Sequence, residues 1–79
     1  MSDVHVPKMG MSTVEVDVTR VLVAPGDPVA VGQPLVEIES EKATFEIEAE
    51  TAGVVSEVLV SEGDVCDVGT VVLRIEEAA

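Results

Sequence analysis

The chain has 79 residues, of which 47% are hydrophobic although only one, Phe45, is aromatic. Its formal net charge of −12 argues against binding to nucleic acid or to an anionic membrane surface, because both attract lysine and arginine. No apolar run reaches the roughly 18 residues of a transmembrane helix, and no basic and then apolar leader follows Met1. We therefore expect a cytoplasmic protein.

The length and the valine content predict a single small all-β domain over residues 1–79. A chain of this size buries only about 60% of the surface that it exposes when unfolded, so a deep catalytic cleft is not expected. Its eighteen valines are β-branched and favour strands. One cysteine, Cys66, and one histidine, His5, cannot supply an internal disulfide and are a poor basis for a metal site, so we expect no bound metal.

Polar and apolar residues alternate in three segments. Valines alternate with polar residues from 14 to 19, and glutamates alternate with apolar residues from 35 to 40 and from 44 to 50. Strict alternation is typical of a strand with one buried and one solvated face. The glutamates are therefore predicted to face the solvent, where they keep an apolar domain soluble.

The sequence contains an internal repeat. Residues 21–39, VLVAPGDPVAVGQPLVEIE, align with residues 58–76, VLVSEGDVCDVGTVVLRIE, at an offset of 37. Identical residues occupy nine of the nineteen positions, namely Val21, Leu22, Val23, Gly26, Asp27, Val31, Gly32, Ile38 and Glu39. Two copies of a four-strand unit predict two facing four-stranded antiparallel sheets, related by a pseudo-twofold axis, in a sandwich or flattened β-barrel.

Each copy reads as a strand, a Gly-Asp turn, a short strand, a turn with glycine, and a strand. Glycine and aspartate tolerate the backbone conformations that tight turns require. The predicted structural turn residues are Gly26, Asp27, Gly32, Gly53, Gly63, Asp64 and Gly69.

The repeat also predicts where Lys42 lies. An offset of 37 relates Lys42 to His5 in one direction and to Ala79 in the other. Both are near the ends of the chain, so a pseudo-twofold axis places Lys42 at the opposite end of the molecule. We expect it at the tip of the hairpin that joins segments 35–40 and 44–50, with SEKA as the turn.

A lysine in this position is a poor catalytic group. Its pKa is ordinarily about 10.4, and neighbouring glutamates favour the charged form, so it is a weak nucleophile. No Ser/His/Asp or Cys/His grouping and no phosphate-binding glycine loop is present. We expect a protein that is not itself an enzyme. Lys42 is either an amine that another enzyme modifies or a solvated lysine in an ion pair with Glu41.

Three segments carry a family resemblance: PKMGMSTVEVDV, GDPVAVGQPLVEIESEKA and AGVVSEVLVSEGDVCDVGTVVLRIE. From about residue 4 to residue 76 the chain resembles the lipoyl domains of the acyltransferase (E2) components of 2-oxo acid dehydrogenase complexes. The resemblance implies a flattened β-barrel and lipoate in amide linkage to Lys42. The family's usual Asp-Lys-Ala is Glu41-Lys42-Ala43 here. We expect Glu39, Ser40, Glu41 and Ala43 to contribute to recognition by partner enzymes.

The resemblance also implies the partners. A lipoate ligase or lipoyl transferase would modify Lys42, and a thiamine-dependent decarboxylase (E1) would then reductively acylate the lipoyl group. An acyltransferase core (E2) would pass the acyl group to coenzyme A, and the flavoprotein dihydrolipoamide dehydrogenase (E3) would reoxidise the dithiol. The isolated domain is expected to be monomeric. Residues from about 77 to 79 are either its end or the start of a linker.

Two alternatives share the fold. In a biotin carrier domain of a carboxylase the lysine resembles Lys42 in position but is normally flanked by methionines, which differ from Glu41 and Ala43. A structural interaction module with this fold would need no modified lysine. Modification of Lys42 is therefore the observation that separates the three functions.

Overall fold

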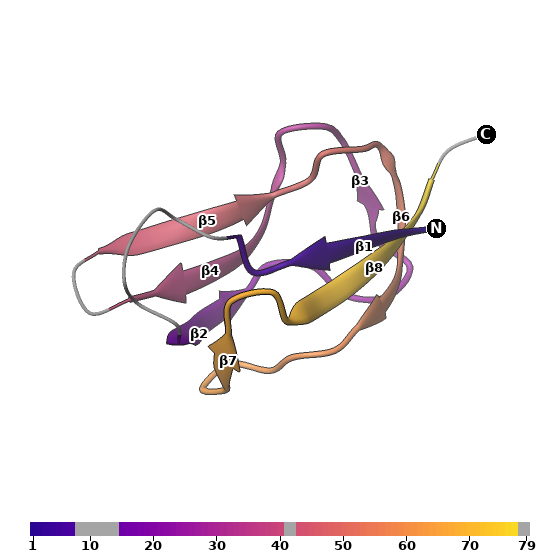
Figure 1. The fold of residues 1–79 in the computed structure, drawn as a ribbon. Coiled ribbons are helices and arrows are strands. Elements are labelled where there is room, and N and C mark those ends of the chain that lie inside the picture. The colour runs from indigo at the N-terminus through magenta and orange to yellow at the C-terminus, as the bar shows by residue number, and fades with distance from the viewer. Residues whose placement is uncertain (8–14, 41–42, 78–79) are drawn as a thin grey trace.

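The computed structural model describes residues 1–7, 15–40 and 43–77 of the chain, and these residues form strands and turns. Figure 1 shows how the chain runs through them. In chain order the eight strands are β1 (Ser2–His5), β2 (Glu15–Val21), β3 (Pro28–Val29), β4 (Pro34–Glu39), β5 (Thr44–Glu48), β6 (Gly53–Val58), β7 (Val65–Asp67) and β8 (Val71–Glu77). No helix with the length and apolar character of a membrane span occurs in this described part of the chain.

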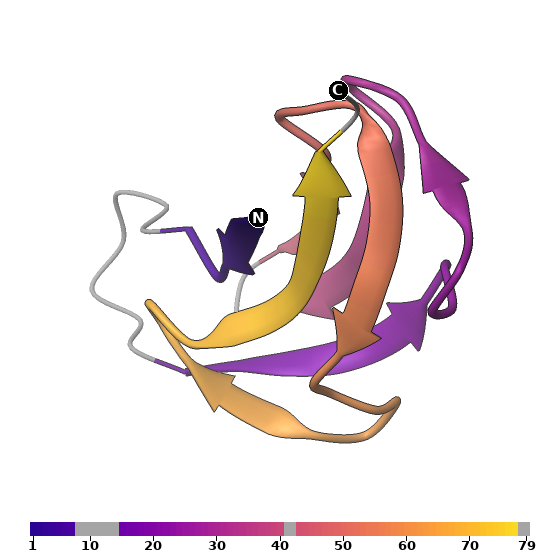
Figure 2. The ribbon, with the colours of Figure 1, turned by 90° about the vertical axis from the view of Figure 1, so that its right-hand side faces the viewer.

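The strands form two antiparallel sheets of four, as the sequence predicted. One sheet has the order β1, β8, β6, β3, and the other has the order β5, β4, β2, β7. The sheets curve and face each other, so that the molecule is a flattened barrel with principal extents of 38, 22 and 16 Å (Figure 2). Exchanging β1–β4 for β5–β8 converts one order into the other, which confirms the predicted internal pseudo-twofold symmetry.

The symmetry extends to irregularities of the sheets. In β2, Thr19 is an extra residue between two pairs with β4, and in β6 the residue 37 positions later, Ser56, has the same place opposite β8. Leu35 and Val72 are likewise extra residues in β4 and β8. A bulge lets two consecutive side chains depart from strict alternation. Leu35 and Val72 are therefore buried beside buried neighbours, a feature that alternation does not predict.

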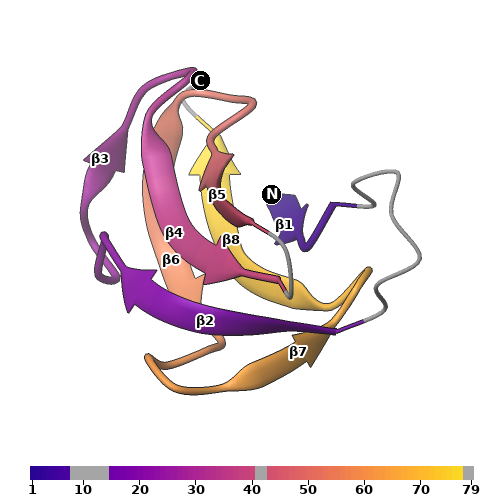
Figure 3. The same cartoon turned by 90° about the vertical axis from the view of Figure 1, so that its left-hand side faces the viewer.

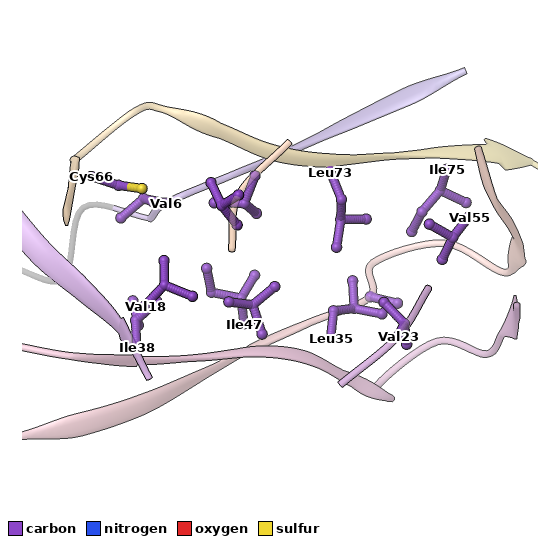
Figure 4. Packing of buried hydrophobic residues seen from close by; sticks show 14 of the residues in the cluster. Val6, Val18, Val23, Leu35, Ile38, Ile47, Val55, Cys66, Leu73 and Ile75 are labelled. Atoms are coloured by element: carbon purple, nitrogen blue, oxygen red, sulfur yellow. The ribbon is translucent and has the colours of Figure 1, made fainter. Parts of the chain in front are cut away.

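The core lies between the two sheets and consists mostly of valine, leucine and isoleucine. Leu35 and Ile38 of one sheet and Leu73 and Ile75 of the other are completely buried, and Figure 4 shows Leu73 pointing across the core toward Leu35. Burying such a side chain stabilises the fold by about 1.5–3 kcal/mol. Phe45 is only half-buried and packs against the edge of this core. Aliphatic side chains thus supply nearly all of the packing.

The two Gly-Asp turns have the same construction. The Ala24 amide donates to the Asp27 carboxylate at 2.8 Å, and the Ser61 amide donates to the Asp64 carboxylate at 2.8 Å. Gly26 has a φ of 95° and its repeat mate Gly63 a φ of 94°, a left-handed conformation that favours glycine. The predicted turns at Gly32 and Gly69 also have positive φ.

The prediction that Gly53 is a turn residue was wrong. Gly53 is the first residue of β6 and is not among the glycines with positive φ. A Cβ atom at this position would collide with the carbonyl oxygen of Glu76 and would lie 2.9 Å from the Cα atom of Glu77. Glycine is required here because two strands approach closely, not because the chain turns.

The predicted equivalence of Lys42 and His5 was also wrong. The backbone amide of Val6 donates to the carbonyl oxygen of Thr70, and the amide of Ala49 donates in the same way to that of Gln33. Gln33 and Thr70 are equivalent at an offset of 37. Val6 and Ala49 are therefore equivalent too, and the offset between β1 and β5 is 43 instead of 37. The cause lies in the connection preceding β2: nine residues separate Val6 from Val16, whereas only three separate their equivalents Ala49 and Gly53. His5 therefore corresponds to Glu48.

Candidate functional site

The candidate site is the hairpin formed by β4 and β5. These strands pair without interruption from Val36 and Ile47 to Glu39 and Thr44, which form the last pair before the turn. This end of the hairpin lies at the opposite end of the molecule from the start of β1 and the end of β8 (Figure 1). The predicted position of the hairpin relative to the ends of the chain is therefore confirmed.

One carbonyl group closes the turn. The amide of Ser40 donates to the carbonyl oxygen of Ala43 at 2.8 Å, and the Ser40 hydroxyl donates to the same oxygen at 3.2 Å. Glu41 and Lys42, the two residues between them in the sequence, lie outside the described residues. What the structure does establish is that the residues on either side of this pair are held together, at the end of a regular two-stranded ladder.

Ser40 differs from the other predicted recognition residues. Its side chain is only 7% exposed, whereas Glu39 and Ala43 are exposed. A buried polar side chain is stable only when it is hydrogen-bonded, and the Ala43 carbonyl provides that partner. Ser40 therefore has a structural role in the turn, while recognition by Glu39, Glu41 and Ala43 remains a prediction.

Acidic side chains surround the base of the hairpin on its sheet. Asp17 of β2 is directly opposite Glu39, and Glu37 of β4 is directly opposite Glu46. Like charges in such cross-strand pairs destabilise a sheet. The sequence predicted a solvated acidic face, but it did not identify Asp17 as the neighbour of Glu39. The register between β2 and β4 was needed for that.

The symmetry-related surface of the other sheet has a different charge pattern. The Arg74 side chain there lies between two carboxylates, with its Nε atom 3.1 Å from Asp3 and its Nη1 atom 3.8 Å from Glu57. The equivalent central residue on the hairpin sheet is Glu37. The two sheets therefore have the same backbone pattern but different surface electrostatics, and the sheet with the hairpin is the more acidic of the two.

Cys66 and His5 form no site together. Cys66 is buried in β7, where burial, followed by the charges of Asp64 and Asp67, raises the pKa of its thiol. His5 is exposed in β1 of the other sheet. Among the residues that the structure describes, no group of three or more His, Cys, Asp or Glu side chains could hold a metal ion.

Comparison with known proteins places the chain in a family. The sequence model of the family described as "Biotin-requiring enzyme", the biotin and lipoyl attachment family, matches residues 2–75. That match covers all eight strands except the last two residues of β8.

Curated relatives share a common description. The chain is 42% identical over 77 residues to the dihydrolipoyllysine-residue acetyltransferase component of the pyruvate dehydrogenase complex of Corynebacterium glutamicum. It is 38% identical over 79 residues to the dihydrolipoyllysine-residue succinyltransferase component of the 2-oxoglutarate dehydrogenase complex of Bacillus subtilis. These matches cover 98% and 100% of the chain but only 11% and 19% of the relatives.

A solved structure has the same fold. The lipoyl domain of the 2-oxoglutarate dehydrogenase complex from Azotobacter vinelandii superimposes with a TM-score of 0.79 and 28% identity, over 98% of both chains. The match covers the whole neighbouring domain, whereas the curated relatives are much longer. The chain therefore belongs to the biotin and lipoyl attachment family, and within it to the lipoyl domains of the E2 acyltransferase components of 2-oxo acid dehydrogenase complexes.

Proposed function

We propose that the domain carries lipoate in amide linkage on Lys42 and presents it to partner enzymes. The observation that carries this proposal is the turn closed by the hydrogen bonds from Ser40 to Ala43, because Lys42 lies between these two residues in the sequence. The last strand pair before the turn has exposed side chains at both Glu39 and Thr44. Because these side chains beside the turn are exposed, an attached group fits at this end of the molecule.

The domain's own contribution is presentation. When bound, lipoate supplies a dithiolane that accepts acyl groups and electrons, and that chemistry belongs to the cofactor. The paired strands β4 and β5 hold the turn at one end of a rigid core, and the Ser40 bonds fix its two sides. Tethering makes each transfer effectively intramolecular, because the carried group does not diffuse away.

The proposed partners follow from the family. They are a lipoate ligase or lipoyl transferase, a thiamine-dependent E1 decarboxylase, an E2 acyltransferase core and an E3 dihydrolipoamide dehydrogenase. Both pyruvate and 2-oxoglutarate complexes occur among the named relatives. The carried acyl group is therefore proposed to come from a 2-oxo acid. We propose a cytoplasmic location for these reactions.

Intact mass spectrometry tests the proposal. After expression with lipoate and its ligase, the chain should gain one lipoyl group, and peptide mapping should locate it on Lys42. The Lys42→Arg variant should gain none, while Lys8→Arg, which removes the only other lysine, should be modified normally. Addition at Lys8, or biotin on Lys42 in preference to lipoate, would refute the assignment.

A further inference from the structure

Within residues 1–7, 15–40 and 43–77, each sheet ends in an unpaired edge strand on one side of the barrel. β1 is the edge of one sheet and β5 is the edge of the other. Paired strands lie about 4.8 Å apart, but no Cα atom of β1 is within 8 Å of one in β5. The two strands therefore do not pair with each other. Figure 3 shows the side of the barrel on which both strands lie.

A groove runs between these two edges. One wall is formed by Ser2–His5 and the other by residues 46–51, and Val31 lies at its border. Val31 is 68% exposed and Val4 is half-buried, so the groove offers apolar surface next to free backbone groups. Unlike the polar hairpin turn, it combines a hydrophobic contact with two sheet edges.

The edge of β5 is suited to accept another strand. Its five residues are regularly paired with β4, and the one extra residue in this ladder, Leu35, belongs to β4. Proteins often protect edges by bulges, prolines or very short strands. The edges β3 and β7 have only two and three residues, whereas β5 has neither a proline nor a bulge of its own.

Charge indicates the kind of strand that would fit. Among the described residues that line the groove, Asp3, Glu46, Glu48 and Glu50 are acidic and none is lysine or arginine. A second copy of this chain would bring the same acidic residues against them, and each copy carries a net charge of −12. A segment with lysine or arginine would instead be attracted to these walls.

We propose that this groove binds an extended, basic segment of a partner protein, which adds as a strand to the free edge of β5. Main-chain hydrogen bonds to β5 hold the segment, and alternate side chains divide between the two environments. Aliphatic side chains contact Val4 and Val31, while lysine or arginine side chains pair with Glu46 and Glu48. This surface is separate from the lysine turn, so binding here does not depend on lipoate.

Titration of the ¹⁵N-labelled domain with a defined peptide tests the proposal. The probe is acetylated and amidated Lys-Val-Lys-Val-Lys-Val-Lys, and one control replaces its lysines by glutamate. A second control is methylated on the amide nitrogens of its valines and cannot donate those hydrogen bonds. We expect saturable amide shifts confined to β1, β5 and Val31, weaker binding at higher salt, and no binding of either control peptide.

Two double variants with equal change of charge separate docking from general attraction. Glu46→Lys with Glu48→Lys should weaken binding at least about tenfold, which corresponds to about 1.4 kcal/mol. Glu15→Lys with Asp67→Lys changes an exposed acidic pair on the far edge of the same sheet and should change affinity less than threefold. Amide spectra of the free variants establish that both remain folded.

Several outcomes would overturn the proposal. Equal loss of affinity in the two double variants would show that only net charge attracts the peptide. Equal binding of the methylated peptide would exclude strand addition. Shifts of β5 amides with protein concentration alone, accompanied by dimerisation in sedimentation, would identify a second copy of this chain as the occupant.

Discussion

Ser40 donates two hydrogen bonds to one acceptor, the carbonyl oxygen of Ala43, through its amide at 2.8 Å and its hydroxyl at 3.2 Å. The residues between them are Glu41 and Lys42. A four-residue turn closed by the backbone alone can open readily, whereas the buried hydroxyl adds a second link across it. The hydroxyl bond thus links the buried side chain of Ser40 to Ala43, the residue that follows the candidate attachment site.

Replacing Ser40 by alanine should therefore weaken the turn. The amide bond to Ala43 remains and the hydroxyl bond is lost, so we expect a loss of about 0.5–1.5 kcal/mol in the free energy of unfolding by urea. The rate of lipoylation should fall several-fold. Ser56→Ala is the control, because among the described residues the Ser56 hydroxyl donates only a weak hydrogen bond, to the sulfur of Met1 at 3.7 Å. Unchanged lipoylation of Ser40→Ala would show that the hydroxyl does not position the turn.

Removal of Lys42, the proposed attachment residue, should separate function from stability. Lys42→Ala should abolish carriage of acyl groups while changing the free energy of unfolding by no more than about 0.5 kcal/mol, as is usual for surface positions. Acylation assays and urea denaturation measure the two effects. Gly26→Val should do the reverse, because a β-branched residue at a φ of 95° is strained by about 1–3 kcal/mol. Equal losses of stability in the two variants would contradict this division.

Replacing either of two glycines, Gly53 or Gly26, by alanine should destabilise the fold, but for different reasons. At Gly53 the added Cβ meets the backbone of Glu76, and such overpacking costs about 1–3 kcal/mol. At Gly26 nothing lies within 4 Å of an added Cβ, so the cost is the left-handed conformation alone, about 1–2 kcal/mol. Amide spectra distinguish them: Gly53→Ala should shift signals in β8, and Gly26→Ala only those in its turn. Undisturbed β8 signals in Gly53→Ala would exclude the steric explanation.

The acids beside the lysine are predicted to assist recognition. Glu39→Gln and Glu41→Gln should each slow lipoylation or reductive acylation, because they remove charge that attracts basic partner surfaces. Glu39→Gln should leave the melting temperature unchanged or slightly raised, since it relieves repulsion with Asp17. Glu57→Gln, on the other sheet, is the control. If all three variants were lipoylated and acylated at wild-type rates, at low and at physiological salt, Glu39 and Glu41 would have no role in recognition and would only form a solvated surface.

The pair formed by the Met1 amine and Glu77, 2.9 Å apart, should add stability only near neutral pH. A hydrogen bond and the charge of Glu77 raise the pKa of the amine above 8.0, so its contribution is full below pH 8 and is lost above that raised value. The amine lowers the pKa of Glu77 below 4.5, so that contribution is lost as the pH falls through the lowered value. The melting temperatures of wild type and Glu77→Gln should differ most between about pH 5 and 7.5, and should converge below the lowered pKa of Glu77 and above the raised pKa of the amine. Glu50→Gln, in which an exposed acid outside this pair is changed, should show no such window.

The sequence predicted the sheets because its signals are local or repeated. Alternation identified the buried faces of β2 and β5, and the repeat identified two equivalent halves. The prediction that His5 is equivalent to Lys42 was wrong because β1 and β5 share almost no identical residues. The change in offset between them could therefore not be recognised in the sequence. The prediction for Gly53 was wrong because the sequence does not distinguish a glycine that forms a turn from one that allows a neighbouring strand to approach closely. Side-chain burial at Leu35 depends on a bulge, which only strand pairing reveals.

The change of offset from 37 to 43 shows where the two halves differ. Each half is one four-strand unit, and the difference in length between the two units falls in the connection that precedes β2. Despite that difference, β1 pairs with β8 in the same register as β5 pairs with β4. Lengthening a connection costs little closure entropy, only about 0.6 kcal/mol for each doubling. We therefore expect a peptide grafted into the connection between β1 and β2 to leave the pairing of the strands intact.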